Sequence, residues 1–156
     1  MSLILRRSLI FITLLAVGLL IYMLWFGMKA DRYDDTAVPY LKSILPIVTS
    51  WHFEQLRPLL SPTARLEFEN EKVQQAYQSF SRLGQLKSTG KPTYLWDRSD
   101  TSKSLGDIEI IGYQVPLEFD SGPATIKINL VADGRSYYIQ HFGIHSEVFA
   151  DQQTVY

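Results

Sequence analysis

The order of apolar and polar positions changes character twice along this chain of 156 residues. Residues 8–28 form an apolar run without a single charge, after which apolar residues recur at helical spacing as far as Leu83. Beyond Gly84 the spacing changes to alternation, which is typical of half-buried strands. The pattern predicts an α+β protein: an apolar N-terminal helix, then about three helices packed on a curved four-stranded antiparallel sheet.

The uncharged run has the length of a transmembrane helix. Its 21 residues, at a rise of about 1.5 Å each, span roughly 30 Å, the thickness of a bilayer's hydrocarbon core. A cleaved signal peptide is the alternative, but its apolar core is shorter, and the residues GMKA that follow lack a small-residue cleavage site. We therefore expect a membrane anchor at 8–28, between a short cytoplasmic N-terminus at 1–7 and a polar neck at 29–36. The residues expected at the membrane interfaces are Arg6, Arg7, Tyr22 and Trp25.

The part after the anchor is long enough for one domain, which we expect over 37–150, with a C-terminal tail at 151–156. From residue 30 onward it has 12 Lys and Arg against 16 Asp and Glu, without long runs of one sign. No nucleic-acid partner is expected, because that requires a concentrated positive surface. Lys29 and Arg32 match the two N-terminal arginines in number, but the N-terminal amine and the short N-terminal flank favour an N-terminus in the cytoplasm. We expect a bacterial inner-membrane protein with its domain in the periplasm.

Three helices are predicted within the domain. A polar cap at 35–36 can start the first, which Pro46 should kink or break. A short second helix is expected over 52–60. The third should run from Ser61, a capping residue in front of a proline, to Gly84, a natural residue just past a helix end.

Four strands are predicted after Gly84, over 93–99, 107–119, 124–131 and a final strand that follows the hairpin signal Asp133-Gly134. Tyr94 and Trp96 should share one face of the first strand. Because Pro116 cannot donate a backbone hydrogen bond, its strand is expected at a sheet edge or bulged there.

The final strand contains a slip in its alternation. Tyr137 and Ile139 are apolar at odd positions, whereas Phe142 and Ile144 are apolar at even ones. A β-bulge between Gln140 and the next residue would produce this change of face.

The segments WHFEQLRPLLSP, FSRLGQLKS, GPATIKINL and YYIQHFGIHS resemble a group of uncharacterised bacterial envelope proteins with the NTF2-like (cystatin-like) roll. The resemblance covers about Val38 to Val148, and Tyr137 replaces the tryptophan usual in that group. It implies a cone of helices and curved sheet around a cleft. That shape is shared by ketosteroid isomerases, dehydratases, scaffolds of secretion machines and plain binding modules. The resemblance therefore indicates almost nothing about activity.

A metal site is not expected. His141 and His145 lie four residues apart, which suits zinc on a helix, but on a strand that spacing separates them by about 13 Å. His52 is the only other imidazole and cysteine is absent, so structural disulfides are excluded as well. No cofactor motif is present; the glycine-rich phosphate loop G-x-x-x-x-G-K is missing.

Acid–base catalysis is the alternative function. A small lyase or isomerase of this fold would hold a carboxylate or imidazole beside a tyrosine hydroxyl in the cone. The candidates are Tyr113, Glu109, Asp97 and His141, none of which lies in a motif that requires chemistry.

The favoured function is a membrane-tethered, non-catalytic accessory module that holds a protein partner or a small apolar ligand. Exposed aromatic residues are the usual anchors of partner recognition, and the chain is 13% aromatic. The partner would be a protein of a membrane complex or, through the exposed sheet face, a second copy of the chain. The candidate contact residues are Tyr94, Trp96, Tyr138, His141 and His145.

Overall fold

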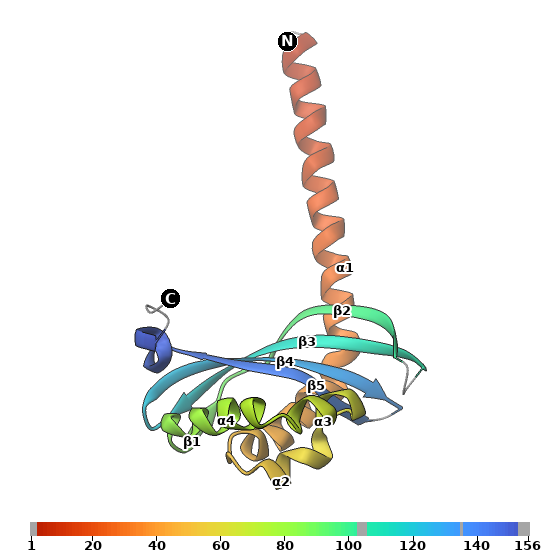
Figure 1. Cartoon of the computed structure of the whole chain (residues 1–156). Coiled ribbons are helices and arrows are strands. Elements are labelled where there is room, and N and C mark those ends of the chain that lie inside the picture. The colour runs from red at the N-terminus through yellow and green to blue at the C-terminus, as the bar shows by residue number, and fades with distance from the viewer. Residues whose placement is uncertain (1–2, 103–105, 135, 153–156) are drawn as a thin grey trace. The chain divides into compact units, whose positions relative to one another are not determined.

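The structure, a computed structural model, describes residues 3–102, 106–134 and 136–152. The described part of the chain is α+β (Figure 1), with four α-helices, three short 3-10 helices and five strands. It divides into two units, residues 1–35 and 36–156, and the second unit contains the sheet.

Helix α1 spans Leu3–Val48, so the expected polar neck at 29–36 is helical rather than a break. In the first unit, the large apolar side chains between Phe11 and Leu24 are 49% to 67% exposed.

The transmembrane anchor expected over 8–28 is wrong. No helix in the described part of the chain combines the length and the apolarity that crossing a membrane requires. The uncharged residues belong to a longer helix, Leu3–Val48, that continues through charged positions. Of the expected interface residues, Tyr22 is exposed, while the side chains of Arg6, Arg7 and Trp25 lie outside the described residues.

The helices of the second unit match the predicted order but not the predicted lengths. Helix α1 does not break at Pro46 and ends two residues later. The short second helix is confirmed as α2 (Phe53–Leu56), continued by the 3-10 turn η1 (Arg57–Leu59). The single long third helix is wrong: Asn70 caps a new helix, so the segment divides into α3 (Pro62–Phe68), α4 (Glu71–Ser79) and η2 (Phe80–Leu83). The predicted cap is confirmed, since the Ser61 hydroxyl accepts the N–H of Ala64 at 3.2 Å.

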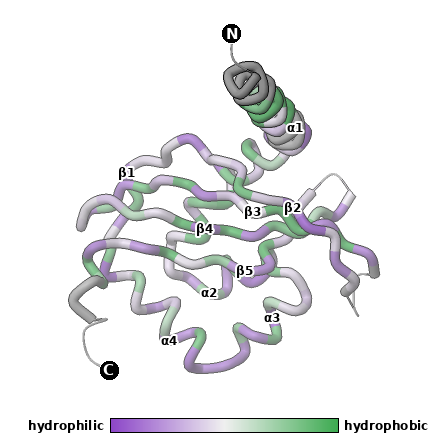
Figure 2. Tube along the Cα trace, turned by 90° about the horizontal axis from the view of Figure 1, so that it is seen from above, coloured by the Kyte–Doolittle hydropathy of each residue, from purple (hydrophilic) through white to green (hydrophobic). Residues whose placement is uncertain are grey.

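The sheet is antiparallel and has five strands rather than the four predicted (Figure 2). Strand β3 (Gly106–Phe119) pairs with β4 (Gly122–Asp133), which pairs with β5 (Ser136–Ser146). The other side of β3 is shared by β1 (Leu86–Thr89) and β2 (Thr93–Ser102), one after the other. The missed strand β1 has only four residues, too few for alternation to identify. The chain closes with the 3-10 turn η3 (Glu147–Gln152).

Pro116 lies in the interior strand β3, so the expected sheet edge is wrong, and no bulge occurs there. It stands where β3 changes partner, between the stretches paired with β2 and with β1. Its carbonyl accepts the N–H of Gly90 at 2.8 Å. The N–H that proline lacks would point to the same side, at the interruption between the two partner strands, where no ladder bond is lost.

Two bulges set which side chains lie on which face of the sheet. The bulge predicted in β5 is confirmed: Asn129 pairs with His141 and Leu130 with Ile139, so Gln140 is the extra residue. A second bulge, not predicted, lies at Leu95 in β2.

One face of the sheet, here called the helix face, is packed against helices (Figure 1). Its buried side chains meet those of α1 and of the short helices in one core. The buried residues are, from the helices, Ala37, Leu41, Ile44, Leu45, Val48, Leu56, Leu60, Ala64, Tyr77 and Leu83, and, from the sheet, Tyr94, Ile111, Tyr113, Val115, Leu117, Phe119, Ala124, Ile126, Ile128, Leu130, Tyr137 and Ile139.

Replacing Leu41 tests this core. The side chain of Leu41 is fully buried, whereas that of Leu66 is 68% exposed. We expect Leu41→Ala to lower the free energy of unfolding in urea by about 2 to 5 kcal/mol, because it leaves a cavity. The matched Leu66→Ala should change it by no more than about 0.5 kcal/mol. Equal effects of the two substitutions would contradict the helix packing described here.

Asp120 provides a pH-dependent test of the turn that joins β3 and β4. Its carboxylate accepts the backbone N–H of Gln85 at 2.8 Å and lies 3.3 Å from the Lys87 ammonium, and these contacts lower the pKa of Asp120 below its ordinary value of 3.8. A lowered pKa contributes stability above pH 3.8 that is lost as the pH falls through the lowered value. Asp120→Asn should therefore be less stable than the wild type at neutral pH, and the difference should vanish as acidification protonates Asp120. Asp133→Asn is the control, because the Asp133 side chain has no hydrogen bond or ion pair among the described residues. A difference that persists in acid would contradict the assignment.

Candidate functional site

The face of the sheet opposite the helices carries an open groove of about 740 Å³, here called the outer groove. Residues directly opposite one another in an antiparallel sheet lie on the same face. One row across four strands is Trp96, Gly112, Asn129 and His141, and the next rows bring Gln114 beside Lys127 and Thr125 beside His145. The groove is lined by Leu95, Trp96, Gln114, Thr125, Lys127, Asn129, His141, Gly143, Ile144 and His145.

Trp96 forms one wall of the outer groove because Gly112 leaves room for its ring. A Cβ placed on Gly112 would lie 2.6 Å from Cε2 and 2.7 Å from Nε1 of the indole, closer than any side chain could approach. The bulge at Leu95 turns Trp96 to this face, away from Tyr94, so the prediction that the two aromatic residues share a face is wrong. Trp96 stays 38% exposed, with its ring supported by backbone.

Lys127, His141 and His145 surround Gly143 at the other side of the groove. Lys127 pairs directly with Gly143, and the two histidines flank Gly143 at alternate positions of β5. Lys127 is the diagonal neighbour of each histidine, and residues so placed lie about 7 to 8 Å apart. Because nothing lies within 4 Å of a Cβ placed on Gly143, the space between the three basic side chains is open.

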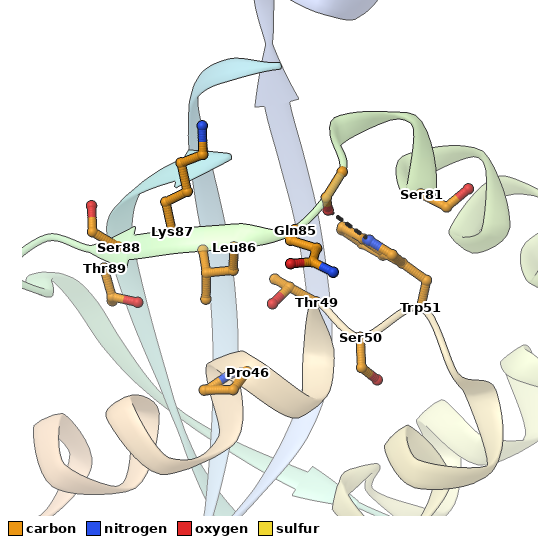
Figure 3. Close-up of a pocket in the computed structure, with 11 residues that line it drawn as sticks. Pro46, Thr49, Ser50, Trp51, Ser81, Gln85, Leu86, Lys87, Ser88 and Thr89 are labelled. Atoms are coloured by element: carbon orange, nitrogen blue, oxygen red, sulfur yellow. Dashed lines mark hydrogen bonds between the residues drawn. The ribbon is translucent and has the colours of Figure 1, made fainter. Parts of the chain in front are cut away.

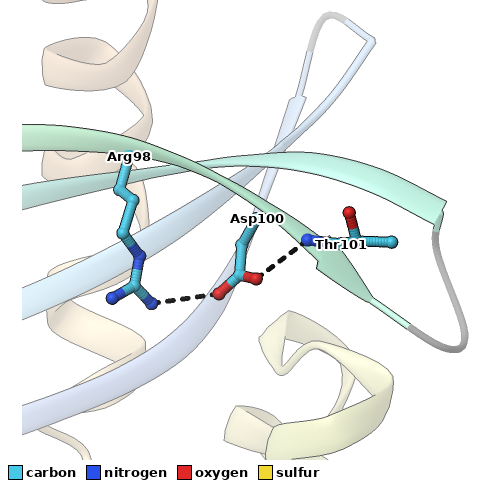
Figure 4. A network of polar contacts seen from close by, with 3 residues as sticks. All are labelled: Arg98, Asp100 and Thr101. Carbon is cyan, nitrogen blue, oxygen red and sulfur yellow. Dashed lines mark hydrogen bonds and ion pairs between the residues drawn. The ribbon is translucent and has the colours of Figure 1, made fainter.

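The polar side chains of the outer groove are not used by the fold. Those of Gln114, Lys127, Asn129, His141 and His145 make no hydrogen bond or ion pair with any residue that the structure describes. The neighbouring cation Arg98 is different, because its guanidinium lies 3.1 Å from the Asp100 carboxylate, which also accepts the N–H of Thr101 (Figure 4). Among the described residues that line the groove, Lys127 is therefore the cation available to a ligand.

A second pocket, here the β1 pocket, has about the same volume, 730 Å³, but a different character (Figure 3). Its polar groups mostly serve the fold. The Trp51 indole donates to the carbonyl of Gly84 at 3.2 Å, the Thr49 hydroxyl to that of Leu45 at 2.8 Å, and Lys87 pairs with Asp120. The β1 pocket is therefore better explained as a structural junction than as a binding site.

A third pocket, here the aromatic pocket, has about 380 Å³ between α3, α4 and β5. Its rings pack on one another: Phe68 lies 6.0 Å from both Tyr77 and Phe142. Burial, partly offset by a backbone hydrogen bond with Trp51, raises the pKa of Tyr77 to about 12. The phenol therefore stays neutral and donates to the carbonyl of Val48 at 2.9 Å, which ties α4 to α1.

The candidates for acid–base catalysis do not all meet. Asp97 pairs with Ile111, which places it on the helix face with Tyr113 and Glu109, whereas His141 lies on the outer face. Tyr113 is fully buried, and its ring contacts Tyr94 edge-on at 6.0 Å. The Tyr94 hydroxyl donates to the Asp97 carboxylate. Neither Tyr113 nor Glu109 lines any of the three pockets described above.

The predicted contact residues are divided between the two faces. Trp96, His141 and His145 meet in the outer groove. Tyr94 is buried on the helix face, and Tyr138 is half-buried on the outer face, where it pairs with Val131 outside the groove. No group of three or more His, Cys, Asp or Glu residues within the described ranges is arranged to hold a metal ion.

Sequence reasoning missed Gly112, Gln114, Lys127 and Asn129 as parts of this site. Alternation placed Lys127 and Asn129 on the polar face of their strand. A glycine inside a strand is the usual sign that a large group approaches the backbone. What could not be seen is the pairing of strands that brings these residues beside Trp96.

Compared with protein-family models, curated proteins and solved structures, the chain has no significant match.

Replacing Gly112 tests the support of Trp96. Gly112→Ala should push the indole off the sheet and, as overpacking does, lower the free energy of unfolding by about 1 to 3 kcal/mol. In protein labelled with 5-fluorotryptophan, the ¹⁹F resonance of Trp96 should move while that of Trp51 stays in place. Gly143→Ala is the control, since its methyl group would meet nothing within 4 Å. An unmoved Trp96 resonance in Gly112→Ala would show that the ring does not rest on Gly112.

Proposed function

We propose that this protein is a non-catalytic binding module that holds a protein partner in the outer groove. The observation that carries the proposal is the row of polar side chains beside Trp96 that form no hydrogen bond or ion pair among the described residues. A folded protein normally satisfies its polar groups internally or leaves them in water. Here several of them converge on one groove next to a large exposed ring.

The composition of the groove supports a protein as the occupant. Tryptophan is among the residues enriched in the anchors that dominate binding energy at interfaces. Trp96 stands on backbone at Gly112, so little of its freedom remains to be lost when a partner covers it. The polar side chains lie on paired strands rather than on loops, which limits their motion in the same way.

A small apolar ligand remains the second proposed occupant, and its site would be the aromatic pocket. The volume of about 380 Å³ lies within the range of small-molecule sites, and rings supply most of the walls. The outer groove is preferred because the rings of the aromatic pocket already contact each other.

The lyase or isomerase alternative stays a prediction, and so does membership of the NTF2-like superfamily. The hydrogen bond from Tyr94 to Asp97 beside Tyr113 supports an acid–base pair on the helix face. That cluster is the place to look for chemistry should the binding proposal fail.

Site-directed photo-crosslinking in the source cells tests the binding proposal. A photoreactive phenylalanine analogue at Gln114 in the groove of the full chain should yield one defined adduct with another protein. The same analogue at the exposed residue Gln75 of α4 should not. Adding Trp96→Ala should remove the adduct without changing the amount of folded protein.

Three outcomes would overturn the proposal. Equal adducts from the groove and from Gln75, or a groove adduct indifferent to Trp96→Ala, would mean that the groove recognises nothing specific. An adduct with a second copy of the chain would make the outer face an interface of a homo-oligomer instead.

A further inference from the structure

The outer groove carries a charge opposite to that of the protein around it. From residue 30 onward acidic residues outnumber basic ones by 16 to 12. Yet the residues that line the groove include Lys127 and two histidines and no carboxylate. A local positive field in the groove attracts acidic ligands to it. Another copy of this acidic chain is also repelled less at the groove than at the rest of the surface.

We infer that the occupant of the outer groove is an extended acidic segment of a polypeptide, with carboxylates at alternate positions and an apolar residue against Trp96. This inference rests on the proposed binding function and names the chemistry of its partner.

The spacing of the basic groups matches such a segment. Lys127 stands between His141 and His145, which are separated by four positions along β5 with open space at Gly143 between them. Carboxylates at alternate residues of an extended chain are about 7 Å apart on one side. Two of them can therefore lie on the two sides of Lys127, each between the ammonium and one imidazole, at the diagonal spacing of about 7 to 8 Å.

Trp96 adds a second element of recognition at the end of the row that begins at His141. Four strands at roughly 4.8 Å intervals place the ring about 14 Å from the imidazole. A segment that lies along β5 beside the histidines and then turns across the strands at His141 covers this distance with about four further residues. Asn129 lies between the two ends and can hydrogen-bond the backbone of the segment, because its amide is unused among the described residues.

Carboxylate fits better than phosphate. Phosphate sites combine a lysine with backbone N–H groups at loops or helix ends, or use the fork of arginine donors. Strand β4 is paired on both sides, so its backbone donors are occupied. The nearby Arg98 is paired with Asp100 and is not among the residues that line the groove. The donors left to the groove are the Lys127 ammonium, the two imidazoles and the side-chain amides.

Binding of synthetic peptides to the full chain tests the inference. The first probe is a short peptide in which Glu alternates with Val and ends in Phe; the second has Gln at each Glu position; the third has phosphoserine there. By isothermal titration the Glu peptide should bind, the Gln peptide about tenfold more weakly, and higher salt should weaken the Glu peptide selectively.

Variants identify the contact. Lys127→Ala should weaken the Glu peptide about tenfold, as the loss of one charged contact does. His141→Asn and His145→Asn should each weaken it less. Lys72→Ala is the matched control, an exposed lysine of α4 that lies outside the groove, and it should leave the affinity unchanged.

The results separate the two proposals. Absence of binding by the Glu peptide, equal affinity for the Gln peptide, or indifference to Lys127→Ala would overturn the acidic ligand. Tighter binding of the phosphoserine peptide would replace carboxylate with phosphate and overturn it too. If the crosslink from Gln114 survives in Lys127→Ala, the binding function stands and only the ligand chemistry fails. If that crosslink never forms, the binding function itself has failed.

Discussion

The contacts of Trp51 decide how the helices lie on the sheet. This residue reverses the chain between α1 and α2 with a left-handed backbone, φ 62°, which costs a non-glycine residue about 1 to 2 kcal/mol. Its ring lies within 6.3 Å of Tyr77, Phe80 and Phe119, and its N–H donates to Gly84. Aromatic contacts of this kind contribute about 0.5 to 1.5 kcal/mol each, so together they outweigh the strain. One side chain thereby joins the end of α1, the end of α4 and strand β3.

The two faces of the sheet differ in chemistry, and the bulges in β2 and β5 set which side chains lie on each face. After the extra residue Gln140 in β5, Phe142 and Ile144 return to the helix face and the two histidines to the outer groove. After Leu95 in β2, Trp96 turns outward and Asp97 toward the helix face. Trp96 is a large exposed ring on the outer face. The backbone of Gly112 supports it there. The helix face provides stability, while the outer face keeps a set of side chains whose hydrogen-bonding capacity the fold does not consume.

Alternation in the sequence was enough to predict β3, β4 and the bulge in β5, because apolar residues there occupy clear odd or even positions. It could not reveal the bulge at Leu95, since Tyr94, Leu95 and Trp96 are all apolar and fit either face. The reversal at Trp51 has no sequence signal, because left-handed backbone usually accompanies glycine. The groove depends on pairings between residues distant in the chain, which local pattern does not contain. The predicted anchor failed as well, since no helix in the described part of the chain is long and apolar enough to cross a membrane.

The extra residue Gln140 is held from the side of the sheet opposite to the groove. Ser61, which caps α3, donates its hydroxyl to the Gln140 side chain at 2.6 Å and its backbone N–H to Ile139 at 2.9 Å. Every residue of β5 after Gln140 owes its face to that insertion. Deleting this single residue would exchange the two faces of the strand's end, burying His141 and His145 among the aromatic rings and turning Phe142 and Ile144 outward. The chemistry of the groove therefore depends on the number of residues in β5 as much as on their identity.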